Sequence, residues 1–193
     1  GQVKLPAGQS YCFSDAARVC YEGRISLSAT GFYATPEIYW DDAKLKGSPY
    51  FYFAYGAALC EVAIDTLTGE SRIIRTDILH DAGNSINPAL DRGQIEGGFV
   101  QGAGWLTTEE LVYGVDGALL THAPSTYKIP ACSDRPCLLN INLYDGEGNH
   151  SETIHRSKAV GEPPLMLGIS VFLACGDALR GLSATNEYPE LNA

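Results

Sequence analysis

The sequence predicts an α+β fold in which antiparallel hairpins form one layer and two helices pack against it. Residues 49–65 are rich in aromatic and β-branched side chains, a turn follows at residues 67–70, and residues 71–80 include Ile73, Ile74, Ile78 and Leu79. This composition is typical of two strands joined by a turn. A glycine-rich helix at about residues 88–104 and an apolar helix at residues 165–182 supply the second layer.

Length and charge limit the kinds of protein this chain can be. Its 193 residues suffice for one substantial domain, which we expect to span residues 1–193 with a polar tail at residues 183–193. A net charge of -10, with only 13 Lys and Arg residues, argues against nucleic acid as a partner. No charged-then-apolar leader and no apolar run of bilayer length is evident, so we expect a cytoplasmic protein without membrane contact.

The 6 cysteines contain no Cys-x-x-Cys pair and no histidine partner at zinc-like spacing. We therefore expect free and mostly buried thiols, and no metal ligands supplied by the protein.

The first quarter of the chain predicts one helix between irregular segments. Residues 15–22 follow a candidate capping residue, Ser14, and form a short helical run. Residues 26–36 are small and polar and end in proline, which favours an extended loop. Residues 41–49 are charged and contain glycine and proline, so we expect a solvated loop there.

The helix that begins at Pro88 or Ala89 is unusual because it contains five glycines, Gly93, Gly97, Gly98, Gly102 and Gly104. Each costs about 1 kcal/mol relative to alanine inside a helix, so we expect something to approach the helix backbone closely. Two explanations remain open. Another helix packs against the glycines, or a flat polar cofactor lies along the helix beside the side-chain amide of Gln94.

Beyond this helix the sequence predicts further strands. Asp116 and Gly117 lie between apolar flanks, which is typical of a hairpin turn with strands on either side of residues 114–117. Residues 138–144 predict another strand, and residues 153–157 a further short one.

The segment at residues 159–168, called the elbow below, places one carboxylate, Glu162, between Gly161 and two prolines. Pro163 disfavours the helical region for the residue before it, so we expect Glu162 to be extended. The helix that follows is apolar on nearly every face, which predicts a buried helix. Glu162 could therefore be a general base, or a structural anion that satisfies the helix start.

Six segments of the sequence resemble one protein family and occur in the same order as in that family. They lie at residues 26–36, 67–70, 75–88, 93–97, 123–130 and 156–168. The family is the xanthine oxidase family of molybdenum hydroxylases. Over roughly residues 14–182 the chain resembles the C-terminal part of the molybdenum-binding subunit of xanthine dehydrogenases of the bacterial type.

The resemblance implies a molybdenum-molybdopterin cofactor. In the family the pterin dithiolene holds the metal, so the protein need not supply a metal ligand. Gln94 occupies the position whose glutamine contacts the pterin, and Gly161 is assigned to the same cofactor-binding site. The glutamate at the position of Glu162 is the general base in a reaction that adds oxygen from water to an electron-poor carbon.

The resemblance also implies a substrate and partners. Pro163 and Pro164 resemble the purine-oxidising branch, which converts hypoxanthine and xanthine to urate. An aldehyde or N-heterocycle oxidase is the alternative, since aldehyde oxidases tend to carry Ser-Gly at these positions. The partners are the upstream part of the same subunit and a subunit with iron-sulfur clusters and FAD. Because much of the site would lie upstream, the alternative of another class is a non-catalytic interaction module.

Several other polar residues near these segments receive no role in the site. His80 and His122 lie beside turns and are expected to bond nearby backbone groups. Asp81 is expected to be a turn or surface carboxylate. Lys158 and Arg156 could contact the cofactor's phosphate, pair with the elbow carboxylate or remain solvated.

Overall fold

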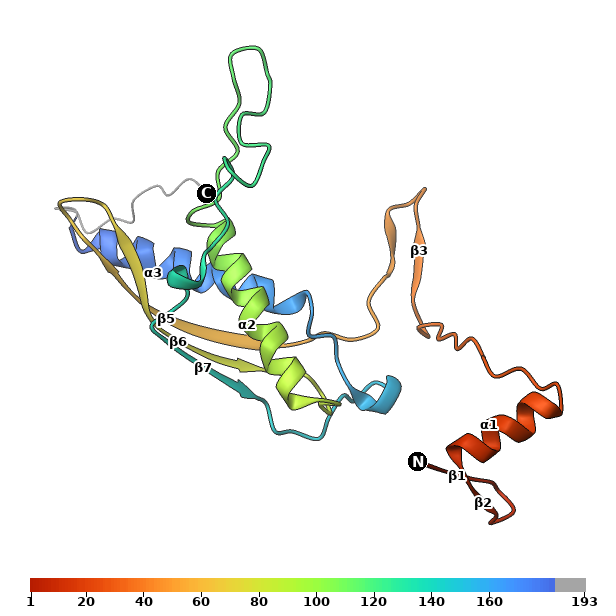
Figure 1. Cartoon of the computed structure of the whole chain (residues 1–193). Helices are drawn as coiled ribbons and strands as arrows, with labels where there is room; N and C mark the ends of the chain where they lie inside the picture. The colour runs from red at the N-terminus through yellow and green to blue at the C-terminus, as the bar shows by residue number, and fades with distance from the viewer. Residues whose placement is uncertain (183–193) are drawn as a thin grey trace. The chain divides into compact units, whose positions relative to one another are not determined.

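The computed structural model describes residues 1–182, which form two compact units that divide between Phe51 and Tyr52 (Figure 1). Helices and small sheets occur together, which confirms the predicted α+β class. The expectation of one domain over residues 1–193 stays a prediction, and the expected tail at residues 183–193 lies outside the described residues.

The first unit contains two short hairpins and one helix. Its elements are β1 (Gln2–Lys4), β2 (Ser10–Cys12), α1 (Phe13–Glu22), β3 (Tyr39–Asp41) and β4 (Lys46–Ser48). Strand β1 pairs antiparallel with β2, and β3 pairs antiparallel with β4. Helix α1 confirms the predicted helix, and residues 26–36 contain no helix or strand, as predicted.

The loop expected at residues 41–49 is wrong in part, because strand β4 lies within it. The turn is closed by Asp41, whose carboxylate accepts the N–H groups of Ala43 and Lys44, both at 3.1 Å. Gly47 then lets the two strands approach, since a Cβ at this position would overlap the backbone of the opposite strand. Local side-chain bonding thus makes a hairpin from a charged segment.

The second unit is built on a three-stranded sheet in the order β5, β6, β7 (Figure 1). Strands β5 (Gly56–Ile64) and β6 (Ser71–His80) form the predicted antiparallel hairpin. Asp65 closes its turn by accepting the N–H of Leu67 at 2.8 Å. The first strand begins at Gly56 rather than at residue 49, because Gly56 pairs with His80, the last residue of β6.

Strand β7 (Leu138–Leu143) confirms the strand predicted at residues 138–144, but it pairs parallel to β6. The prediction of antiparallel hairpins throughout is therefore wrong at this edge of the sheet. A parallel neighbour needs a long connection, and the chain from β6 to β7 passes through a helix on the way.

That helix, α2 (Pro88–Trp105), confirms the glycine-rich helix. The Asn87 side chain caps it by accepting the N–H groups of Ala89 and Leu90 at 3.2 and 3.3 Å. Pro88 occupies the first turn, where its missing N–H leaves no bond unmade.

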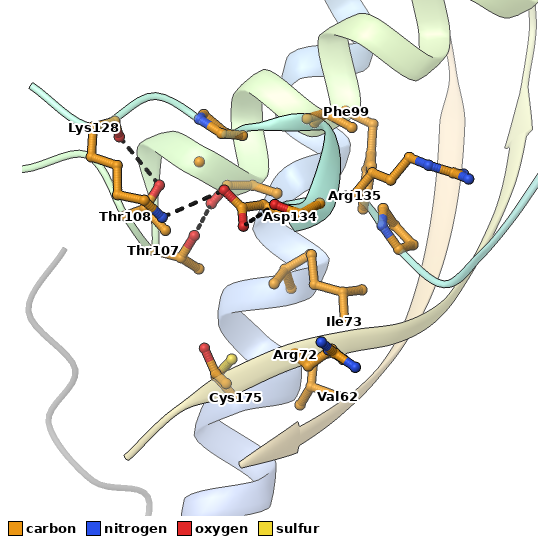
Figure 2. A pocket seen from close by; sticks show the side chains of 18 of the residues that line it. Val62, Arg72, Ile73, Phe99, Thr107, Thr108, Lys128, Asp134, Arg135 and Cys175 are labelled. Atoms are coloured by element: carbon orange, nitrogen blue, oxygen red, sulfur yellow. Dashed lines mark hydrogen bonds and ion pairs between the residues drawn. The ribbon is translucent and has the colours of Figure 1, made fainter. Parts of the chain in front are cut away.

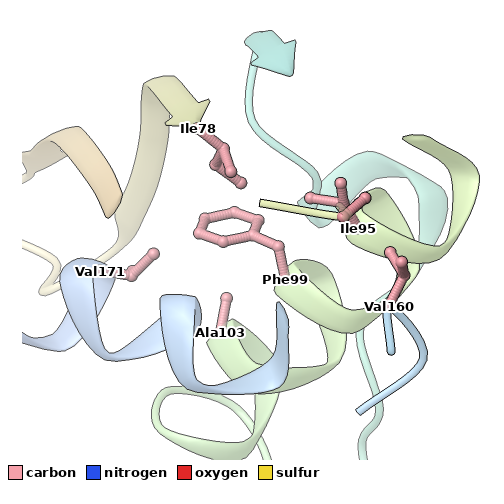
Figure 3. Packing of buried hydrophobic residues seen from close by; sticks show 7 residues of the cluster. Ile78, Ile95, Phe99, Ala103, Val160 and Val171 are labelled. Atoms are coloured by element: carbon pink, nitrogen blue, oxygen red, sulfur yellow. The ribbon is translucent and has the colours of Figure 1, made fainter. Parts of the chain in front are cut away.

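The core lies between one face of the sheet and the helices α2 and α3 (Ile169–Arg180). Residues of β5 and β7 alternate between half-buried and exposed, so the opposite face of the sheet is open. The ring of Phe99 on α2 lies between Ile78 of β6 and Val171 of α3 (Figure 3). This packing fixes the middle of α2 against the sheet.

The C-terminal helix differs from its prediction in three ways. It begins as a 3₁₀ helix at Pro163–Gly168 before α3, and Glu162 is helical, with φ -96° and ψ -41°, rather than extended. It is not buried on every face, because Leu173 is 64% exposed while only Val171 and Gly176 of α3 are buried. The reason is that the described residues cover only the face that packs on α2 and β5.

By length and composition alone, Pro163–Arg180 would be long and apolar enough to cross a bilayer, with a mean hydropathy of 1.2, which the sequence analysis did not anticipate. A core helix meets the same criterion, and this segment packs against α2 and β5.

Two shorter predictions are also corrected. The turn at Asp116 and Gly117 is present, with the N–H of Gly114 bonded to the carbonyl of Ala118 at 2.8 Å, but a single bridge replaces the expected strands. A single 3₁₀ turn (Ile154–Arg156) replaces the strand expected at residues 153–157, because His155 and Arg156 adopt positive φ values of 54° and 55°, which a strand does not allow. The carbonyl of Arg156 accepts hydrogen bonds from the N–H groups of Asn84 and Asn149, at 2.9 and 3.0 Å.

Candidate active site

The structure places Gly161 near Gln94, two of the three residues that the sequence assigned to the site. An ideal Cβ on Gly161 would lie 3.9 Å from Oε1 of Gln94, and Glu162 is the next residue. The amide therefore comes from the first half of α2 and the carboxylate from the elbow. Both side chains are exposed, and neither makes a hydrogen bond or ion pair with any of residues 1–182.

The elbow is seated on α2 through glycines. A Cβ on Gly98 would lie 3.0 Å from Cβ of Pro164, which is buried, and a Cβ on Gly102 would overlap the carbonyl of Leu165. These two glycines confirm the packing explanation for the glycine-rich helix. Gly104 belongs to the same category, since a Cβ there would overlap the ring of Pro130.

Gly93 and Gly97 differ from the other three glycines. A Cβ added at either residue would meet no heavy atom of the structure within 4 Å. Packing within the described residues therefore does not explain them. Together with Gln94 and Gly161 they form an open patch of backbone and amide, called the Gln94 patch below. Such a surface fits the edge of a flat, polar group, because no side chain holds the group away from the helix.

The basic residues before the elbow have different environments. Lys158 pairs with Asp81, with 2.6 Å between Nζ and Oδ2, and not with Glu162. The side chain of Arg156 is exposed. Asp81 is the turn carboxylate that the sequence suggested, since it accepts the N–H of Gly83 at 2.8 Å, but its side chain is only 17% exposed. Burial alone would raise the pKa of Asp81, but Lys158 and the N–H of Gly83 outweigh it and hold this pKa below its ordinary value.

The two histidines are also in different environments. His122 bonds the carbonyl of Leu119 through Nδ1 at 3.0 Å, which confirms the expected local backbone contact. The same expectation is wrong for His80. Its side chain is 1% exposed, and neither ring nitrogen has a hydrogen-bond partner among residues 1–182. Burial lowers the pKa of His80, with a smaller opposing effect from Asp81, so the ring is neutral near pH 7.

A cavity of about 350 Å³ lies elsewhere in the second unit (Figure 2). It is bordered by the C-terminal end of α2, the β5–β6 hairpin and a 3₁₀ helix (Cys132–Asp134), and its lining includes Arg72, Lys128 and Arg135. None of Gln94, Gly161 and Glu162 lines it. The assigned residues therefore lie on an open surface of the described residues.

No cluster of three or more His, Cys, Asp or Glu side chains placed to hold a metal ion occurs within residues 1–182. The 6 cysteines are free, as predicted, but the expectation that most are buried is wrong. Cys12, Cys132 and Cys137 are exposed because they lie in short elements and loops outside the core.

Comparison with known proteins supports the resemblance found in the sequence. A family model described as a molybdopterin cofactor-binding domain matches residues 1–136. The chain is 47% identical over 188 residues to "Xanthine dehydrogenase 2" of Arabidopsis thaliana, covering 92% of this chain and 14% of that protein. It is 52% identical over 167 residues to "Xanthine dehydrogenase/oxidase" of Gallus gallus, covering 86% of this chain and 12% of that protein.

A solved structure gives the same result. Quinoline 2-oxidoreductase from Pseudomonas putida 86 matches with a TM-score of 0.57 and 31% sequence identity, over 63% of this chain and 15% of that chain. The two xanthine dehydrogenase relatives are eukaryotic, so the bacterial type stays a prediction. The matches to the family model, to the relatives and to the solved structure agree, and the chain therefore belongs to the molybdopterin cofactor-binding domain family of the molybdenum hydroxylases.

Proposed function

We propose that this chain forms part of the active site of a molybdenum hydroxylase that oxidises purines, converting hypoxanthine and xanthine to urate. The observation that carries the proposal is the approach of Gly161, the residue before Glu162, to the amide of Gln94 beside open helix backbone. The chain spans 14% and 12% of the two xanthine dehydrogenase relatives, so the complete site requires further polypeptide.

The Gln94 patch holds the edge of the molybdopterin. The amide of Gln94 offers one acceptor and two donor hydrogens to a polar ring edge. Gly93 and Gly97 let that edge lie close to the helix, since no side chain intervenes. When bound, the molybdenum cofactor supplies the redox chemistry, taking up the two electrons that leave the substrate.

Glu162 supplies the base. Its carboxylate accepts the proton that water gives up as the new bond to the substrate carbon forms. No residue among 1–182 occupies this carboxylate by a hydrogen bond or ion pair, so it is free to accept a proton. The packing of Pro164 on Gly98 restricts the elbow, so the carboxylate is held rather than swinging freely.

The intact enzyme would include the upstream part of this subunit and a subunit with iron-sulfur clusters and FAD, in the cytoplasm. The length of the relatives, which are named xanthine dehydrogenases and are much longer than this chain, supports the presence of further polypeptide. An aldehyde or N-heterocycle oxidase is the second candidate, because a quinoline oxidoreductase matches the structure.

An assay of the complete enzyme separates these functions. Urate production from xanthine, with little turnover of an aromatic aldehyde or quinoline, is the expected result. Faster turnover of the aldehyde or quinoline than of xanthine would instead identify an aldehyde or N-heterocycle oxidase. The third possibility is that the chain is a non-catalytic interaction module. Reconstitution of this chain with the upstream polypeptide tests it, since a cofactor-bound complex without activity would identify such a module.

A further inference from the structure

The ion pair between Lys158 and Asp81 is the most enclosed of those in residues 1–182. The two side chains are 7% and 17% exposed, and Nζ lies 2.6 Å from Oδ2. Other lysine–aspartate pairs, such as Lys44 with Asp41, have much more exposed side chains. The enclosed pair joins Asp81, the residue after strand β6, to Lys158, which lies directly before the elbow and four residues before Glu162.

Backbone hydrogen bonds hold Lys158 and Ala159 close to the ion pair. The N–H of Lys158 donates to the carbonyl of Ala82 at 2.9 Å, and the N–H of Ala159 donates to the hydroxyl of Tyr52 at 2.9 Å. Gly83 has a φ of +61°, and a Cβ there would overlap the carbonyl of Arg156. Only a glycine at position 83 therefore lets the backbone of the loop after β6 come this close to residues 156–158, directly before the elbow.

The charges around Lys158 explain why it holds this position. The carboxylate of Asp81 accepts a hydrogen bond from Nζ of Lys158. The ring centroid of Tyr55 lies 5.3 Å from the same Nζ, within range of a cation–π contact. Asp81 is itself fixed, because its second oxygen accepts the N–H of Gly83 at 2.8 Å. The amine is therefore committed to the loop after β6, which leaves the carboxylate of Glu162 without a cationic partner.

We propose that the Asp81–Lys158 ion pair is a positioning device that fixes the elbow so that Glu162 faces the Gln94 patch. This inference rests on the proposed function, because the position of Glu162 matters only if it is the base. The elbow is then held on both sides of the carboxylate, by Lys158 before it and by Pro164 on Gly98 after it. Loss of the first anchor leaves the base misplaced although the core is intact.

The test uses the complete enzyme with three variants of the pair. Lys158→Met removes the charge and keeps an apolar stem of similar length, and Lys158→Arg keeps the charge. The double variant Asp81→Asn with Lys158→Met removes both charges, so no unpaired buried charge is left to unfold the protein. Lys44→Met, which breaks an exposed pair with Asp41 at 3.0 Å, is the matched control.

We expect Lys158→Met and the double variant to lower kcat for xanthine roughly 10- to 100-fold, with KM changed less than 3-fold and molybdenum content unchanged. Hydrogen exchange should become faster at the amides of Lys158 and Ala159, because their bonds depend on the elbow position. Lys158→Arg should recover most of the kcat, and Lys44→Met should leave kcat and exchange unchanged.

The inference is overturned if both neutral variants keep wild-type kcat and elbow exchange, even if their thermal midpoints fall, because the pair is then only structural. A fall in molybdenum content that accounts for the whole loss of activity also overturns it. The proposed function fails separately if Glu162→Gln keeps wild-type turnover. A Glu162→Gln variant without activity beside an unaffected Lys158→Met variant refutes the positioning role alone.

Discussion

The backbone of Gly161 lies against the side-chain amide of Gln94, with 3.9 Å between an ideal Cβ on Gly161 and Oε1 of the glutamine. This approach is set by the packing of Pro164 on Gly98, which seats the elbow on α2. It places an amide and a stretch of open helix backbone beside Gly161, the residue before Glu162. The following predictions concern the complete enzyme.

The open and the packed glycines of α2 should respond in opposite ways to alanine. Gly97→Ala should leave stability unchanged or raise it by up to about 1 kcal/mol, because alanine favours the helix and its Cβ meets no described atom. Its molybdenum content should fall, since the methyl group occupies the Gln94 patch. Gly102→Ala should instead destabilise the protein, because its Cβ would overlap the carbonyl of Leu165.

Thermal unfolding and metal analysis of the two variants check this contrast. Unchanged molybdenum content in Gly97→Ala would show that the cofactor does not lie on this part of α2.

Gln94→Ala should weaken cofactor retention without changing the fold. The amide has no partner among residues 1–182, so its removal leaves no described group unsatisfied. Loss of one or two hydrogen bonds to the pterin, about 1–2 kcal/mol, corresponds to roughly 5- to 30-fold weaker binding. Pterin and molybdenum content after dialysis measure the effect. Gln101→Ala, on the exposed side of the same helix, is the control and should retain its cofactor.

His80→Leu should make stability less dependent on pH. Burial holds the pKa of His80 below its ordinary value of 6.5, so the unfolded chain binds a proton more readily than the folded one. The neutral histidine therefore supports the fold fully above about pH 6.5, and this support is lost as pH falls toward the lowered pKa. Leucine also removes two buried nitrogens that lack partners, each of which costs about 1–3 kcal/mol.

Thermal midpoints at several pH values between 5 and 8 should thus rise most for His80→Leu at the acidic end of the range. An equal change at every pH would mean that His80 titrates alike in the folded and unfolded states.

The helices and strands that depend on residues close together in the chain were predictable from the sequence. The hairpin of β5 and β6 follows from aromatic and β-branched residues on both sides of the turn at residues 67–70, and α2 begins where Asn87 and Pro88 favour a helix start. The parallel pairing of β7 was not predictable, because strand direction depends on the path of the chain between β6 and β7. The exposed face of α3 was missed because apolar composition does not say how much of a helix its neighbours cover.

The residues of the candidate site were predictable only in part. The resemblance to a known family indicated Gln94, Gly161 and Glu162, and the structure places the first two close together. The pair of Asp81 and Lys158 was missed because the two residues are distant in the chain, and an aspartate before a glycine turn is typical of a surface loop. The available signal was a lysine directly before the apolar Ala159 and Val160.

The central claim is that Glu162 is the base, and its most direct test is the turnover of xanthine by Glu162→Gln with the molybdenum content measured on the same sample. We expect a loss of roughly 10²- to 10⁴-fold in kcat at full molybdenum occupancy, because glutamine keeps the shape but cannot accept the proton. Glu152→Gln, also exposed, should retain wild-type turnover. Near wild-type turnover by Glu162→Gln with full molybdenum occupancy would contradict the account.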